Sequence, residues 1–237
     1  MKIITWNCNM VFRKKAGYIL AHRPDILVVP ECEHPDKLKF PDGIPLPTDV
    51  IWHGDNAHKG LGVFSYSDYR FKLLDCHNPA FKNILPIQVS NGKIDFLLFA
   101  VWANNPQDKE GAYVTQVWKA FHHYENLLAG KDSIWIGDFN SNTIWDKPRR
   151  EGNHSALVKK LETHQVFSTY HTFHHQVQGQ ETDPTFFLYR HRDKSYHMDY
   201  CFASAALLQK LKQVEIGAYE HWSMYSDHKP LIAEFDL

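Results

Sequence analysis

IWIGDFN at residues 134–140 and YSDHKPLI at residues 225–232 are the two stretches of the chain that decide its fold. Each contains an apolar run, typical of a buried strand, with polar and chemically active residues at one end. The Gly-Asp-x-Asn pattern alone indicates a turn at a strand end. Three more polar-tipped runs accompany the two stretches, TWNCN at 5–9, PDILVVPEC at 24–32 and YHMDYCFAS at 196–204. Together they make five polar-tipped strands in one order.

The order and residue types of these five runs resemble the endonuclease/exonuclease/phosphatase superfamily, which includes DNase I, exonuclease III and the AP endonucleases. The resemblance extends over residues 3–236, and its most specific parts are GDFN at 137–140 and SDH at 226–228. It implies an α/β fold, the DNase I-like four-layer sandwich, in which two packed mixed β-sheets are flanked by helices. The site of that fold lies at one end of the sheets.

The composition is that of a globular protein with one large core. A chain of 237 residues with 43% hydrophobic and 14% aromatic residues can bury such a core, so we expect a single domain over residues 1–237. No stretch reaches the roughly 18 uncharged apolar residues of a membrane span. Residues 1–20 lack the apolar segment of a signal peptide. These features predict a cytoplasmic protein without a membrane span.

The overall charge excludes one way of binding a polyanion. The 26 Lys and Arg residues and 27 Asp and Glu residues give a formal net charge of −1, so there is no global basic field. A nucleic acid would have to bind local basic tracts, which occur at residues 13–15, 147–150 and 190–194. Each tract alone is typical of a solvated surface. The third follows an aromatic run and precedes Asp199, which favours it as a tract beside the site.

The histidines and cysteines do not predict a zinc site. Although there are 16 His and 4 Cys residues, neither a Cys-x-x-Cys nor a His-Glu-x-x-His pattern occurs. We expect Cys8, Cys32, Cys76 and Cys201 to be buried, reduced thiols. HTFHH at 171–175 offers three His residues that could gather a metal, but its polarity favours a hydrophilic loop.

Hydrophobic periodicity predicts many strands and few helices. Apolar residues recur at three- and four-residue steps from about 111 to 129, which predicts an amphipathic helix, and shorter helices are expected at 12–22 and 154–163. SNGK at 90–93 predicts a tight turn between two strands. Two packed mixed sheets therefore fit better than a doubly wound parallel sheet. The predicted strands are 2–9, 25–31, 49–53, 61–66, 84–89, 93–102, 132–138, 184–189, 196–203, 213–220 and 230–236.

Hydrolysis of a phosphodiester needs an aligned nucleophile and neutralisation of the charge that develops on the phosphate oxygens. The resemblance makes Glu31 the principal metal ligand and places Asp227 close to the metal. Asn9 occupies a position where AP endonucleases often carry an Asp that helps with the metal. Because Asn9 is neutral, the pattern does not decide whether this position supplies a second metal ligand. Oxygen ligands of this kind suit Mg²⁺ or Mn²⁺.

The resemblance also assigns catalytic roles. Asp138 would orient and deprotonate the attacking water, Asn140 would hold the phosphate and support Asp138, and Asn7 would bind the phosphate. His228 would contact a non-bridging oxygen while paired with Asp199, whose carboxylate would be costly to bury without a partner. Alternation along a strand predicts that Asp138 and Asn140 share a face, as do residues 7 and 9.

One position departs from the family pattern. Relatives usually place a His or Tyr against the phosphate where this chain has Trp102, and an indole offers one donor and no acid-base chemistry. Either Asn104 takes that role or the site lacks the group. In the loop that follows, we expect Arg190, Arg192 and Lys194 to bind the substrate backbone.

The residues favour a magnesium-dependent nuclease that cleaves DNA, or RNA, by water attack on phosphorus, with nucleic acid as its substrate. A second interpretation is a phosphatase or phosphodiesterase for a phospholipid headgroup, an inositol phosphate or a nucleotide. A third is a catalytically silent binding module. Binding alone has no need of Glu31, Asp138 and Asp227 together, so the full set of acids argues against the third interpretation.

Overall fold

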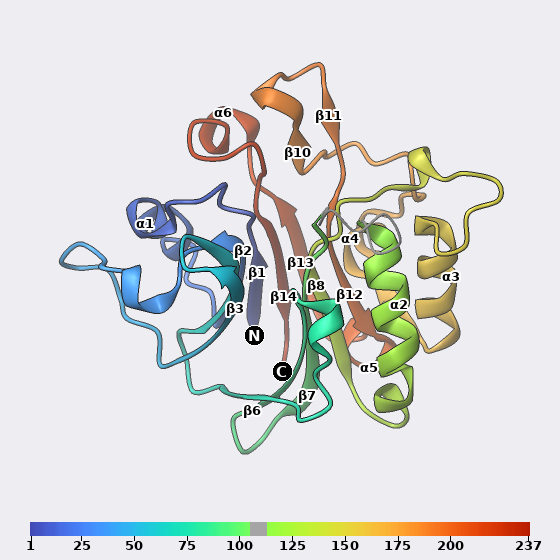
Figure 1. The fold of residues 1–237 in the computed structure, drawn as a ribbon, viewed down its shortest axis with the longest axis horizontal. Coiled ribbons are helices and arrows are strands. Elements are labelled where there is room, and N and C mark those ends of the chain that lie inside the picture. The colour runs from blue at the N-terminus through green and yellow to red at the C-terminus, as the bar shows by residue number, and fades with distance from the viewer. Residues whose placement is uncertain (105–112) are drawn as a thin grey trace.

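The computed structural model describes residues 1–104 and 113–237 and contains two six-stranded β-sheets packed face to face (Figure 1). The first sheet has the order β13-β14-β1-β2-β4-β3 and the second β5-β6-β7-β8-β12-β9. The strands of the first are β1 Lys2–Thr5, β2 Ile26–Cys32, β3 Asp49–Asn56, β4 Lys59–Ser65, β13 Leu211–Ile216 and β14 Leu231–Phe235. Those of the second are β5 Arg70–Leu73, β6 Ile84–Ser90, β7 Asp95–Trp102, β8 Ser133–Asp138, β9 Val166–Ser168 and β12 Asp199–Ser204.

Both sheets are mixed. β1 pairs in parallel with β2 and in antiparallel with β14, while β7 pairs in parallel with β8 and in antiparallel with β6. Strand side chains alternate between the two faces, so Ile134 and Ile136 of β8 pack in the core between the sheets, whereas Trp135 packs under the helices. A short hairpin of β10 Phe186–Phe187 and β11 Ser195–Tyr196 stands beyond one end of the sheets (Figure 1).

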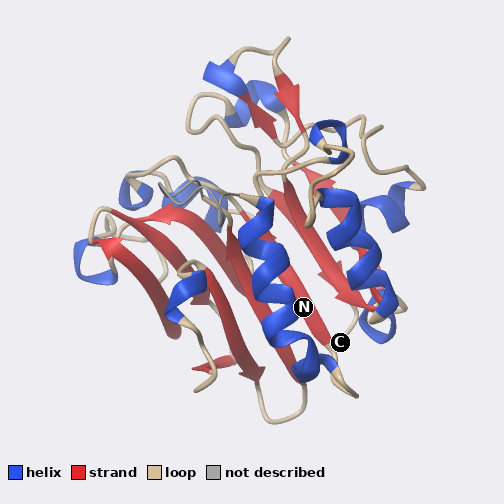
Figure 2. Ribbon diagram, turned by 45° about the vertical axis from the view of Figure 1, so that its right-hand side comes forward, coloured by secondary structure: helices blue, strands red, loops and turns tan. Residues whose placement is uncertain are grey.

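Helices cover the outer faces of the sandwich. Figure 2 shows two of the longer helices lying across the second sheet, α2 Val114–Tyr124 and α3 His154–Thr163, and they bury Phe121 and Leu157 against it. On the first sheet, α1 Ala16–Leu20 buries Ile19. The remaining helices are α4 Thr169–His174, α5 Ala205–Leu208 and α6 Tyr219–Trp222. Turns of 3₁₀ helix lie at Phe12–Lys14, Pro35–Lys37, Pro79–Phe81, Glu125–Leu128, Thr143–Trp145 and Leu188–Arg190.

This arrangement confirms the predicted four-layer α/β sandwich, and most single elements also match. The predicted helix at 111–129 is α2 followed by the 3₁₀ turn Glu125–Leu128, with residues 111–112 outside the described part of the chain. The turn at 90–93 joins β6 to β7, and Gly92 adopts a φ of 82°, which only glycine tolerates easily.

Four local predictions were wrong. The strand expected at 2–9 ends at Thr5, and only β10 forms within 184–189. Within the strand predicted at 213–220, β13 ends at Ile216 and α6 begins at Tyr219. Of the loop expected at 171–175, residues 171–174 belong to α4, because the Ser168 side chain accepts a hydrogen bond from the His171 backbone N–H and starts the helix, and His175 follows its end.

The described cysteines are free thiols. Cys8, Cys32 and Cys201 are buried, as expected, but Cys76 is exposed because it follows β5 in a surface turn. In the described residues, the model has no helix that combines the length and apolar character needed to cross a membrane.

Candidate active site

Strand pairing brings three predicted site residues to one end of the second sheet. Asp138 is the last residue of β8, and its register partners are Asp199, the first residue of β12, and Trp102, the last residue of β7. His228 precedes β14 of the other sheet and forms an isolated bridge with Phe186. The two sheets therefore meet at these polar residues.

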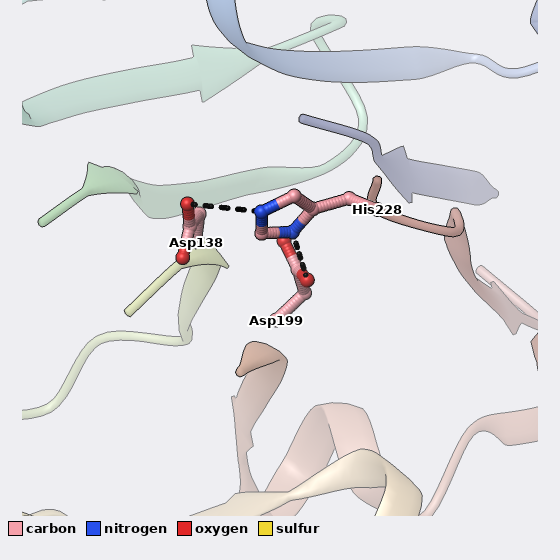
Figure 3. Close-up of side chains that lie close together, drawn as sticks. All are labelled: Asp138, Asp199 and His228. Atoms are coloured by element: carbon pink, nitrogen blue, oxygen red, sulfur yellow. Dashed lines mark hydrogen bonds and ion pairs between the residues drawn. The ribbon is translucent and has the colours of Figure 1, made fainter. Parts of the chain in front are cut away.

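Asp138, Asp199 and His228 form a buried line of charges (Figure 3). The His228 Nδ1 donates to Asp199 Oδ2 at 2.8 Å, and the His228 Nε2 lies 3.9 Å from Asp138 Oδ2. Both carboxylates are 0% exposed and His228 is 4% exposed. The imidazole is therefore held by Asp199 and turned toward Asp138.

Two amides hold the Asp138 carboxylate. The Nδ2 groups of Asn7 and Asn140 each donate to Asp138 Oδ2 at 3.0 Å, and the Asn140 backbone N–H donates to Oδ1 at 2.9 Å. Asn140 has a φ of 47°, so it lies beyond the regular strand in a conformation that asparagine tolerates better than most residues. The expected proximity of Asp138 and Asn140 is present, but it arises from this turn rather than from strand alternation.

Burial and neighbouring charges shift the pKa values of Asp138 and His228. Burial raises the pKa of Asp138 to about 7, against the opposing charge of His228 and the hydrogen bonds from Asn7 and Asn140. Burial alone would lower the pKa of His228, but the charges of Asp199 and Asp138 outweigh it and raise that pKa to about 10. The neighbouring carboxylates thus favour the cationic form of the imidazole, and burial favours the protonated form of Asp138.

The structure adds residues that the sequence pattern did not single out. The Thr185 side-chain oxygen accepts the backbone N–H groups of Met198 at 2.9 Å and Asp199 at 3.0 Å, and so fixes the start of β12. Ser226 Oγ donates to the Asn7 carbonyl at 2.7 Å and accepts the His228 N–H at 3.0 Å. Thr185 had no recognisable signal in the sequence, whereas Ser226 belongs to the Ser-Asp-His pattern.

Glu31 lies on the other side of the site. The register of β2 against β4 shifts between Pro30 and Cys32, as at a β-bulge, and Glu31 has a φ of 64°. Its side chain is 19% exposed, and its carboxylate lies 3.2 Å from the Lys59 ammonium group. No lysine or arginine stands near Glu31 in the sequence, so this contact comes from strand pairing alone.

Asn9 and Asp227 occupy chain segments next to Glu31. The Cys8 backbone N–H donates to the Pro30 carbonyl at 3.2 Å, and Ser226 binds the chain at Asn7 as described above. The expectation that Asn7 and Asn9 share a strand face was wrong, because β1 ends at Thr5 and Asn9 has a φ of 49°. Within the described residues, no hydrogen bond or ion pair joins Glu31, Asn9 and Asp227 to one another.

The donor atoms on this side fit a hard cation. Glu31 and Asp227 offer carboxylate oxygens and Asn9 a carboxamide oxygen, the ligands that Mg²⁺ and Mn²⁺ favour. Ligand atoms of Asp138, Asp199 and His228 also lie within 4.8 Å of one another. Within this group the His228 Nδ1 is hydrogen-bonded to Asp199 Oδ2 at 2.8 Å.

Trp102 and Asn104 line a hollow beside Glu31. Trp102 is only 7% exposed, and the Lys59 ammonium group lies 5.4 Å from the centre of its ring. Asn104 is half-buried. The hollow has a volume of about 160 Å³ and is lined by Gly54, Asp55, Asn56, Lys59, Asn83, Trp102 and Asn104.

The predicted basic loop lies between β10 and β11, beyond the same end of the sheets (Figure 1). Arg190 is exposed and donates to the Met224 carbonyl at 3.4 Å, and Lys194 is also exposed. Arg192 pairs with Glu220 at 3.0 Å and lies 5.3 Å from the ring centre of Tyr219. Part of the positive charge expected for substrate binding is therefore already matched within the protein.

A larger pocket adjoins the buried line on its other side. It has a volume of about 370 Å³ and is reached from the active site at Asn140 and Phe186. Phe186 also contacts the catalytic imidazole candidate, with ring centroids 4.7 Å apart for Phe186 and His228. The lining combines apolar and polar side chains, namely Tyr113, Val114, Asn140, Ser141, Asn142, Trp145, Asp146, Arg150, Asn153, His154, Phe186, Leu188 and Met198.

Neither a scan against protein-family models nor a search of curated proteins gives a match. Solved structures do match. The 3′ phosphatase NExo from Neisseria, bound to a product DNA hairpin, has a TM-score of 0.72 and 22% identity over 100% of both chains. An AP endonuclease from Archaeoglobus fulgidus gives 0.67 and 20% over 100% of both chains. The AP endonuclease LMAP from Leishmania major gives 0.72 and 15% over 100% of this chain and 87% of its own. These likenesses establish the DNase I-like fold.

Proposed function

We propose that the chain is a divalent-metal-dependent phosphodiester hydrolase that acts on DNA by water attack on phosphorus. The observation that carries the proposal is the buried line of Asp199, His228 and Asp138, with the amides of Asn7 and Asn140 on the Asp138 carboxylate. A binding module would gain nothing from burying two carboxylates around an imidazole, because burial of charge is costly.

Each residue of the line suits one part of the reaction. A carboxyl with a pKa of about 7 is able to accept a proton from water near neutral pH, which is the task assigned to Asp138. The imidazolium of His228 places a positive charge 3.9 Å from Asp138 Oδ2, beside the position where an attacked phosphate would gain negative charge. Asn7 and Asn140 fix the direction of the Asp138 carboxylate and so the direction of the attacking water.

The second half of the site would hold the metal. Glu31 is the principal ligand in this proposal, with Asp227 beside it and Asn9 as a neutral oxygen donor. A bound Mg²⁺ or Mn²⁺ supplies charge neutralisation at the phosphate oxygens. The chain's own contribution there is the carboxylate of Glu31, whose side chain is 19% exposed and which pairs with the Lys59 ammonium group.

Two features favour DNA over a small phosphoester. Structural neighbours include a 3′ phosphatase bound to a DNA hairpin and AP endonucleases. In addition, the pocket of about 370 Å³ beside Asn140 and Phe186 offers aromatic and apolar surface on which a nucleotide unit next to the scissile phosphate could pack. Arg190 and Lys194 on the exposed loop are placed to contact the sugar-phosphate backbone.

A substrate panel tests this proposal. We expect hydrolysis of one or more of abasic duplex, nicked plasmid, single-stranded DNA and 3′-phosphorylated DNA, lost in excess EDTA and restored by Mg²⁺ or Mn²⁺. Asp138→Asn, prepared in parallel, controls for a contaminating nuclease. Full turnover in EDTA would refute the metal requirement. Hydrolysis confined to RNA, inositol phosphates or sphingomyelin would refute the choice of DNA, and no hydrolysis of any substrate would favour the binding module.

A further inference from the structure

Lys59, the first residue of β4, contacts Glu31 and Trp102. Its ammonium group is 3.2 Å from Glu31 Oε2 and 5.4 Å from the centre of the Trp102 ring. Glu31 belongs to β2 in the first sheet and Trp102 to β7 in the second, so the lysine bridges the two sheets at the active-site end. Its side chain is 39% exposed, which leaves the ammonium group accessible from solvent.

The Trp102 ring lies beside the Lys59 ammonium group. In the sheet, Trp102 is the register partner of Asp138, and neighbouring strands lie about 4.8 Å apart. The Trp102 residue is only 7% exposed, and its ring presents a face to the Lys59 cation. The polar group expected at this strand end is therefore absent from β7, but a cationic group reaches the same place from β4.

Lys59 has polar neighbours besides Glu31. The hollow beside it, about 160 Å³ in volume, is lined by Asn56, Asn83 and Asn104, and by Asp55, whose carboxylate is paired with Lys82 at 2.6 Å. Amide N–H groups and an ammonium group together suit phosphate oxygens.

On the proposed function, we infer that Lys59 binds a non-bridging oxygen of the substrate phosphate, with Trp102 as the surface under its ammonium group. It supplies from β4 the phosphate contact that Trp102 is unable to make. The lysine stem is flexible, so the ammonium group turns from Glu31 to the phosphate while it stays over the same ring. Lys59 is thus a substrate-binding residue of the site.

The test uses binding rather than turnover. Lys59→Met keeps most of the stem and removes the charge, and it is combined with Asp138→Asn so that the oligonucleotide stays intact. Relative to Asp138→Asn alone, we expect about tenfold weaker binding of the oligonucleotide, since a hydrogen bond to a charged group is lost. We also expect the slope of log affinity against log salt, measured at a fixed Mg²⁺ concentration, to flatten by about 0.7 to 0.9.

Lys160→Met is the matched control in the same Asp138→Asn background. Lys160 lies on α3 and pairs with Glu125 at 3.1 Å with 33% of its side chain exposed, values close to those of the Lys59 pair. Since it belongs to a helix on the outer face, its loss should change neither affinity nor slope. Lys59→Arg retains the charge and should recover most of the affinity. A thermal melt of each variant checks that the fold is kept.

Mn²⁺ binding, followed by electron paramagnetic resonance of the free ion, separates this role from that of a counter-ion. If Lys59 only neutralises Glu31, Lys59→Met would tighten Mn²⁺ binding several-fold and leave the salt slope unchanged. That outcome overturns the inference while the proposed function stands. If Asp138→Asn alone binds no oligonucleotide in a salt-dependent way, the proposed function fails first, and the assignment of Lys59 fails with it.

Discussion

The two halves of the candidate site are built in different ways. Asp138, Asp199 and His228 are fully or almost fully buried and are tied to each other and to Asn7 and Asn140. Glu31 is partly exposed on an irregular stretch of β2 and has a lysine as its ion-pair partner. The first half is held by hydrogen bonds among its own residues, whereas the described polar contact of the Glu31 carboxylate is an ion pair with Lys59.

Backbone conformation sharpens this contrast. Asn9, Met10 and Val11 form a run of residues with φ values of 49°, 63° and 54°, and Glu31 shares this left-handed region. For Val11, which is β-branched, such a conformation is particularly costly. Strain of this kind persists where the surrounding structure over-determines it and is frequent at functional sites. On the half proposed to bind the metal it includes a β-branched residue, whereas in the buried half it falls on Asn140, a residue type that tolerates this conformation better.

The largest effect should follow from damage to the buried half. Asp138→Asn keeps the size of the side chain but removes the carboxylate proposed to accept a proton from water. We expect kcat to fall by about 10² to 10⁴-fold or more, with little change in substrate affinity. Single-turnover kinetics at saturating metal measure this loss. Turnover close to that of the wild type would reject Asp138 as the base.

Asp199→Asn should have the next largest effect and change the pH profile. The Asp199 charge helps to raise the pKa of His228 to about 10, so its removal lowers that pKa and deprotonates the imidazole at lower pH. We expect a loss of kcat of about 10²-fold at pH 8 and a smaller loss at pH 6. An unchanged basic limb of the kcat profile would argue against a catalytic imidazolium.

The same variant has a stability signature. In the wild type the pKa of His228 is raised above the value of about 6.5 expected in the unfolded chain. Its contribution to stability is therefore fully present below about pH 6.5 and is lost as the pH rises through about 10. The destabilisation caused by Asp199→Asn, measured by urea unfolding, should be larger at pH 6 than at pH 9.

Activity lost through a substitution in the half of the site proposed to bind the metal should be recovered by added metal. Glu31→Gln removes the charge of the proposed principal ligand, and we expect the Mg²⁺ concentration for half-maximal activity to rise by about 10 to 100-fold. Activity should recover largely at high Mg²⁺, because the buried half remains intact. If excess Mg²⁺ restores nothing, Glu31 has a role other than metal binding. Isothermal titration with Mn²⁺ gives a direct measure of the change.

The number of strand-like runs predicted two packed mixed sheets, and the family resemblance supplied the four-layer sandwich with its site at one end. The apolar run predicted a strand at 132–138 that ends in Asp138, and β8 ends at that residue. The assignment of Asp199 to His228 came from the family resemblance, and the structure brings the two side chains together at 2.8 Å. Their catalytic roles remain predictions.

Other features of the site could not be derived from local patterns. Lys59 reaches Glu31 only because β4 pairs with β2 across a register shift, and nothing in HKG at 58–60 indicates such a partner. The extended run assumed for Asn7 and Asn9 failed because left-handed backbone replaces the strand after Thr5. Short elements set by tertiary contacts are the ones that single-sequence periodicity misses.

The smallest effect should come from the basic loop, which lies outside both halves. We expect the double variant Arg190→Ala and Arg192→Ala to flatten the salt dependence of oligonucleotide binding by about one unit. Two arginines without other partners would contribute nearly two units to the slope of log affinity against log salt. The expected change is smaller because the Arg192 charge is already paired with Glu220. Glu220→Gln should free Arg192 and steepen the wild-type slope. Binding to an uncleavable oligonucleotide across a salt series decides the matter: a slope that none of these substitutions alters would place the nucleic acid away from the loop.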